Sequence, residues 1–222
     1  MPLSVEHLLE SLDDPFVFFP LQSVCRSLNA LVSENDESMM ARMGPSGVAR
    51  KYWDVPTELM HEEIGLLLGA AFVLGQATLT QTVALLKRIR LEVGATSEIP
   101  EKKSEMLTLG SLDDAREGTV SVAVIDLAAN YFKHHQEWPD DWVTTEGKGN
   151  LQTRTIQGCR DLGMRPGAFL LTDNLYSALG ALGHYPPDVS NIEQTIRSWR
   201  GRLARGLYAS LDLADPNLEV RV

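Results

Sequence analysis

The chain has 222 residues, of which 44% are hydrophobic and 23% are charged, and its formal net charge at pH 7 is −10. These values are typical of one large or two small globular domains with a sizeable core. The two cysteines, Cys25 and Cys159, lie far apart in neither a CxxC nor a CxxH spacing, which excludes a disulfide framework and a zinc knuckle and favours a reducing compartment. The acidic balance argues against nonspecific nucleic-acid binding by the whole surface.

The N-terminal third of the sequence predicts two helices. The first runs over Ser4–Leu12 and ends at the following acidic pair and proline. The second follows the aromatic segment FVFFP, because apolar residues then recur at spacings of three and four, which is a helical period. That second stripe consists of Leu21, Val24, Leu28 and Leu31. Glycine and proline around Gly44 are expected to break the chain.

The next segment predicts one long helix, which starts at Asp54 or Thr57 and reaches about Val93, with a bend or split near Gly75. Residues 64–86 carry no charge, but glutamines and threonines interrupt their second half. We therefore interpret them as a buried central helix and not as a membrane span. Because the acidic N-terminus also lacks the pattern of a secretory signal, we expect a cytoplasmic protein with no membrane contact.

Residues 95–111 are polar and are predicted to be a loop. A capping pair, Ser111 and Asp114, then opens a helix that ends at Pro139, although the β-branched run TVSVAVI leaves a strand as the alternative. A loop over 139–149 follows. Three more helices are predicted over residues 150–162, 172–183 and 188–211, the last with an apolar stripe made by Ile192, Ile196, Trp199, Leu203 and Leu207.

No segment alternates convincingly between apolar and polar residues, and no Asn-Gly hairpin signal occurs. The sequence therefore predicts an all-α fold, a helical bundle with short connections. We interpret residues 1–222 as a single domain, and leave open that residues 1–50 form a looser N-terminal helical segment.

The segment NYFKHHQEW, residues 130–138, is the strongest candidate for a chemical site. At 100° per residue its two histidines separate, so that His135 falls within the apolar arc and is expected to be a core residue with a satisfied hydrogen bond. His134 borders a polar stripe whose members can touch one another, namely Asp126, Asn130, Lys133 and Glu137. A histidine there could transfer protons, but a structural role for His134 and an exposed Lys133–Glu137 ion pair are equally compatible with the pattern.

An amphipathic helix that carries Asn130 and His134 as NYFKH in an all-α chain resembles the HEPN superfamily. The motif of that superfamily is an arginine, usually followed by a polar residue, with a histidine four to six residues beyond the arginine. Asn130 matches the polar position and His134 or His135 the histidine, whereas Ala129 stands where the arginine belongs. The arginine holds the scissile phosphate and offsets transition-state charge.

The resemblance implies a bacterial toxin or anti-phage protein that binds or cleaves RNA without a metal or other cofactor. His134 and Asn130 would be the catalytic residues, supported by Lys133, Glu137, Asp126 and His135. It also implies a homodimer, in which Arg154, Arg160 or Arg165 could replace the missing cation. The alternative is a non-catalytic helical interaction module (an antitoxin, immunity or regulatory subunit) that binds a protein partner, so the sequence leaves open whether the chain is an enzyme.

Two other patterns occur in the sequence. His61 or Glu62 could join His134 and Glu137 in a metal site, but HEEIG is not the HExxH motif and adjacent histidines on a helix point about 100° apart, so no metal site is expected. The four arginines of the last predicted helix surround its apolar stripe, which predicts a solvated, ion-paired helix with a Glu193–Arg197 pair.

Overall fold

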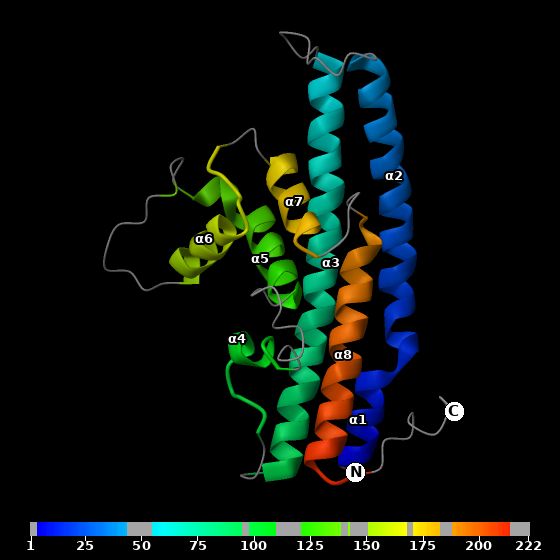
Figure 1. The fold of residues 1–222 in the computed structure, drawn as a ribbon, viewed down its shortest axis with the longest axis vertical. Helices are drawn as coiled ribbons and strands as arrows, with labels where there is room; N and C mark the ends of the chain where they lie inside the picture. The colour runs from blue at the N-terminus through cyan, green and yellow to red at the C-terminus, as the bar shows by residue number, and fades with distance from the viewer. Residues whose placement is uncertain are drawn as a thin grey trace.

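The computed structural model describes residues 4–43, 55–94, 98–109, 121–138, 142, 151–167, 171–182 and 188–213. Helix accounts for 85% of this part of the chain, and no strand occurs within it. The all-α prediction is therefore confirmed. Long helices that run side by side form a bundle, and a group of shorter helices packs on one side of it (Figure 1).

The N-terminal helices form one side of the bundle. In α1 (Val5–Asp13) the hydroxyl of Ser4 accepts a hydrogen bond from the amide of His7, and Leu8, Leu9 and Leu12 are buried. Asp14 then caps a 3₁₀ turn, η1 (Pro15–Phe18), which leads directly into α2 (Phe19–Met43). The predicted first helix and its stop at the acidic pair are thus confirmed.

The centre of the molecule is α3 (Val55–Val93), 39 residues long and unbroken at Gly75, where a bend had been predicted. It contacts α2, α5, α7 and α8. Glycines on its buried side allow close approach, since a Cβ at Gly69 would overlap the ring of Phe132 and one at Gly75 would overlap Ile192. The helix therefore continues without interruption past both glycines.

By length and composition alone, α3 is long and apolar enough to cross a membrane, with a mean hydropathy of 1.5 over its most apolar window. Half of that window, 50%, is buried inside the protein. The buried central helix of a helical bundle can have the same length and hydropathy. These two properties therefore do not distinguish a core helix from a membrane-spanning one.

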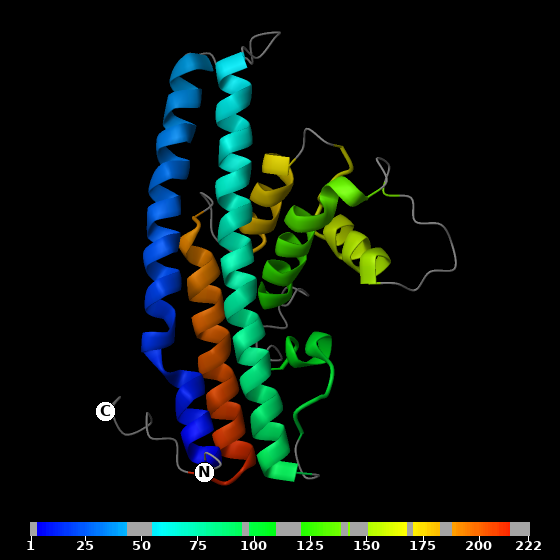
Figure 2. The ribbon, with the colours of Figure 1, turned by 180° about the vertical axis from the view of Figure 1, so that it is seen from behind.

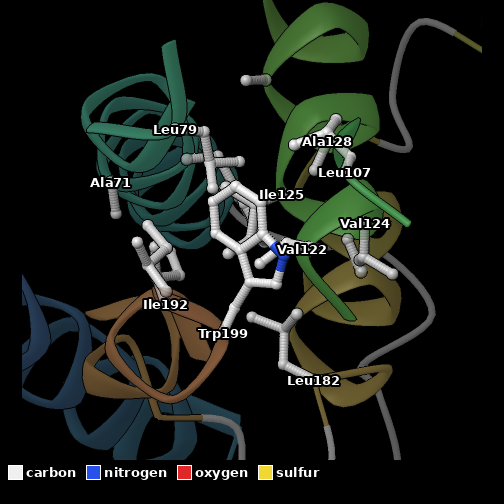
Figure 3. Packing of buried hydrophobic residues seen from close by; sticks show 14 of the residues in the cluster. Ala71, Leu79, Leu107, Val122, Val124, Ile125, Ala128, Leu182, Ile192 and Trp199 are labelled. Atoms are coloured by element: carbon white, nitrogen blue, oxygen red, sulfur yellow. The ribbon is translucent and has the colours of Figure 1, made fainter. Parts of the chain in front are cut away.

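The last helix, α8 (Ser190–Ser210), completes the bundle against α1, α2 and α3. Trp199 lies at the centre of the packed side chains, between residues of α3, α5 and α8 (Figure 3), and its indole donates to the carbonyl of Leu109 at 2.9 Å. Four of the five predicted stripe residues are fully buried and Leu207 is partly buried. The predicted Glu193–Arg197 pair also forms.

The shorter helices lie on the side of α3 opposite α2 in both views (Figures 1 and 2). They are α4 (Lys103–Met106), α5 (Ser121–His134) with the 3₁₀ turn η4 (His135–Glu137), α6 (Leu151–Asp161) and α7 (Leu171–Gly180). Of these, α4, α5 and α7 contact α3 directly, whereas α6 packs on α5. The group is therefore attached to α3 mainly through α5 and α7.

Several local predictions were wrong. In α2 the buried stripe is Leu21, Cys25, Leu28 and Val32, whereas Val24 and Leu31 are exposed. The predicted loop over 95–111 contains α4, and the strand alternative is excluded from Ser121 onward, where α5 is helical. The expected cap at Ser111 and Asp114, and all of the expected 139–149 loop except Trp142, lie outside the described residues.

Candidate functional site

The candidate residues lie where α5 changes into a 3₁₀ turn. The α-helix ends at His134, whose backbone leaves helical geometry with φ −126° and ψ −2°, and η4 then carries His135–Glu137. The tighter 3₁₀ winding places residues three apart over one another. It therefore brings Glu137 above His134 and not above Lys133.

Three of the six side chains predicted from the sequence, Asn130, His134 and Glu137, line one pocket. It has a volume of about 260 Å³ and opens between the end of α5 and the first turns of α6. Its walls are formed by Asn130, His134, Glu137, Trp138, Gln152 and Thr155. Asn130 and His134 therefore face the same space, as their spacing of four residues had predicted.

His134 and Glu137 form a polar pair at the mouth of this pocket. The imidazole Nδ1 lies 3.2 Å from the Glu137 carboxylate, and the two side chains are 48% and 71% exposed. A carboxylate on Nδ1 favours the tautomer in which Nε2 is the free acceptor. The predicted Lys133–Glu137 pair is wrong, because Glu137 pairs with His134 and Lys133 turns towards α3.

The polar stripe of α5 is held by a hydrogen-bond network centred on Gln76 of α3. Its amide nitrogen donates to the side-chain oxygens of Asp126 at 2.8 Å and Asn130 at 2.9 Å, and its oxygen accepts from the Lys133 ammonium at 2.7 Å. The ammonium of Lys103, on α4, donates to Asp126 at 2.6 Å. The network fixes the orientation of the Asn130 side chain. It also holds the Lys133 ammonium on Gln76 of α3, away from the pocket.

His135 belongs to a different environment. Its Nδ1 lies 2.9 Å from the carbonyl oxygen of Phe132, and its ring packs 5.3 Å from that of Tyr131. Tyr131 in turn contacts Trp138 and Trp142. His135 is half-buried beside this aromatic group and does not line the pocket, in agreement with its predicted packing role.

Ala129, at the position of the missing motif arginine, is fully buried at 0% exposure. It does not line the pocket, so an arginine at this position would have to displace core side chains to reach a phosphate there. None of the six lining residues is Lys or Arg. Arg154 is exposed on α6 and directly precedes the lining residue Thr155 in the sequence.

The described residues give less support to a cysteine nucleophile or a metal site. Burial raises the pKa of both Cys25 and Cys159 to about 12, so neither thiol is an activated nucleophile. His61 lies 3.5 Å from Asp173 of α7. No three His, Cys, Asp or Glu side chains in this part of the chain form a group that could hold a metal ion.

Sequence reasoning missed Gln76, Lys103, Gln152 and Thr155, because each lies on a helix other than α5. Gln76 carried a usable signal, since a glutamine within an otherwise apolar, buried stretch requires hydrogen-bond partners from a neighbouring helix. The positions of Gln152 and Thr155 carried none, because nothing in the local sequence states that α6 packs on α5.

The chain was compared with models of protein families, with curated proteins and with solved structures, and none of the three comparisons found a match.

Proposed function

We propose that the pocket between α5 and α6 contacts single-stranded RNA, and that His134 transfers a proton there during metal-independent cleavage. The observation that carries this proposal is the convergence of Asn130 and His134 on one pocket, with Glu137 on the Nδ1 atom of His134. A histidine oriented by a carboxylate is an effective general base near neutral pH.

In the proposed reaction, the RNA 2′-hydroxyl attacks the adjacent phosphorus while its proton moves to Nε2 of His134. The bond to the 5′-oxygen breaks, and that oxygen takes up a proton from water, so that a 2′,3′-cyclic phosphate and a 5′-hydroxyl are formed. Because the oxygen of the Asn130 side chain accepts from Gln76, its Nδ2 is the group that donates to a phosphate oxygen. The cation that offsets the transition-state charge must come from outside the lining, and the candidate is Arg154, which is exposed and directly precedes Thr155.

The test is cleavage of a fluorescent single-stranded RNA by the full chain in the presence of EDTA. We expect His134→Ala to lower the rate by about 100-fold or more. His7→Ala is the matched control, because His7 also forms an exposed His–Glu pair three residues apart, with Glu10 at 3.6 Å on α1. The control should cleave at the wild-type rate, and both variants should keep the wild-type melting temperature.

A second candidate is a non-catalytic interaction module, favoured by the burial of Ala129 and by the absence of lysine and arginine from the pocket lining. In this role the pocket would receive a side chain of a protein partner. Wild-type protein that leaves the RNA intact both with EDTA and with added divalent metal would contradict cleavage and favour this candidate. Equal loss of cleavage in the His134 and His7 variants would contradict the assigned role of His134.

A further inference from the structure

A stripe of exposed small and apolar residues runs along the whole length of α3, on the side that faces away from its packed neighbours. Leu59, Leu66 and Leu91 are 59%, 57% and 78% exposed. Ala77 and Ala84 are exposed and Ala70 is partly exposed. Other sides of the helix are covered by α1, α2, α4, α5, α7 and α8.

The spacing of these residues is that of a coiled-coil seam. From Leu59 to Leu91 they recur alternately at four and three residues, with Glu63, Val73, Thr80 and Lys87 at the intervening positions. A repeat of 3.5 residues keeps one face turned towards a partner helix, with a left-handed crossing of about 20°. The alanines would allow the two backbones to approach closely.

The stripe is also complementary to itself when a second copy is antiparallel. Gly75 lies midway between Leu59 and Leu91, between Glu63 and Lys87, and between Val73 and Ala77. A two-fold axis level with Gly75 would therefore place Leu59 of one copy beside Leu91 of the other. It would likewise place Glu63 beside Lys87. Such an isologous contact repeats every pair twice.

The charged residues that flank the stripe favour the antiparallel orientation of the two helices. Glu62 and Glu63 are exposed near the start of the stripe, and Lys87 and Arg88 are exposed near its end, next to the exposed acid Glu92. A parallel copy would place like charges together, which is unfavourable. An antiparallel copy places Glu62 and Glu63 opposite Arg88 and Lys87, and its one like-charge pair is Glu58 with Glu92. An anionic membrane would be repelled by the acidic end. The segment from Leu59 to Leu91 spans about 48 Å at 1.5 Å per residue, long enough for a stable helix pair.

We propose that α3 pairs with α3 of a second copy of this chain, antiparallel about a two-fold axis level with Gly75. This interface does not depend on the pocket or on its proposed function, because the pocket lies on α5 and α6.

The test is sedimentation equilibrium on the full chain, with charge exchange at one contact pair. The wild type, 24.5 kDa as a monomer, is expected to sediment with twice that mass. Glu63→Lys and Lys87→Glu should each weaken the dimer by at least about tenfold, because each repeats a like-charge contact twice. The double variant should recover the wild-type dissociation constant. Arg205→Glu, an exposed change on α8, is the control and should have no effect.

Ala77→Arg provides an independent disruption near the axis, and circular dichroism checks that it remains helical. A wild-type protein that is monomeric at every soluble concentration would overturn the proposal. So would a dimer that Ala77→Arg leaves intact, or single variants that the double variant fails to rescue. Wild-type binding to vesicles of phosphatidylcholine and phosphatidylglycerol, with no dimer in solution, would assign the stripe to a membrane and would equally overturn it.

Discussion

At the residue scale, Arg200 shows how a charge can join helices instead of facing solvent. It is 3% exposed, and its guanidinium donates to the carbonyls of Leu12 at 2.9 Å and Ser11 at 2.6 Å while it stacks on Phe18. Burial lowers the pKa of Arg200, an effect that the nearby Asp14 and Asp13 oppose. The prediction of a solvated arginine was wrong here, because α1 and its carbonyls cover this face of α8.

Arg200→Ala is expected to lower the free energy of unfolding by about 2–4 kcal/mol, since two buried carbonyls at the end of α1 would lose their donors. Urea denaturation followed by circular dichroism measures this change. Arg205→Ala, in an exposed position on the same helix, should alter the free energy of unfolding by less than about 0.5 kcal/mol. Similar values for the two variants would contradict the structural role of Arg200.

The adjacent histidines are also explained at this scale. The change from α-helix to 3₁₀ geometry at His134 directs that side chain into the pocket with Glu137, whereas His135 remains against Tyr131. The helical wheel predicted the separation correctly. It could not predict the pairing of His134 with Glu137, because a uniform 100° step places Glu137 beside Lys133.

At the element scale, the packing of α3 depends on glycines that touch neighbouring side chains, whereas Gly206 of α8 touches none. Gly69 faces the ring of Phe132 with no room for a Cβ, whereas Gly206 has no neighbouring atom within 4 Å of such a Cβ. The same substitution should therefore have opposite effects at the two positions.

Gly69→Ala is expected to destabilise the protein by about 1–3 kcal/mol, because the ring of Phe132 and with it the end of α5 must move. Gly206→Ala should stabilise it by about 0.5–1 kcal/mol through the lower entropy of the unfolded chain. Thermal or urea unfolding measures both. Stabilisation by Gly69→Ala would show that α5 does not approach α3 as closely as the structure indicates.

Helix positions were predictable from the sequence where the local signals agreed. Ser4 and Asp14 delimit α1, Gly163 has the left-handed φ of +76° beyond α6, and the apolar stripe of α8 is buried almost as predicted. In α2 the choice between two overlapping apolar stripes was not local. The packing of α2 against α3 selects Cys25 and Val32 and leaves Val24 and Leu31 in solvent.

At the scale of the whole molecule, α3 links the features described above. Its buried side carries Gln76, which holds Asp126 and Asn130 of α5 in place, and its exposed side carries the stripe proposed to pair with a second copy. The candidate site was therefore only partly predictable. The sequence of α5 supplies Asn130 and His134, but their supports come from α3 and α4 and the far wall of the pocket comes from α6.

We propose that the pocket lined by Asn130 and His134 contacts RNA. This contact is tested most directly by titrating the full chain with a single-stranded RNA oligonucleotide and following the imidazole Cε1–H resonances of the five histidines by NMR. We expect the His134 resonance to shift with increasing RNA while that of His7 does not move. A titration in which the His134 resonance stays unchanged, or in which His7 and His134 shift alike, would contradict it.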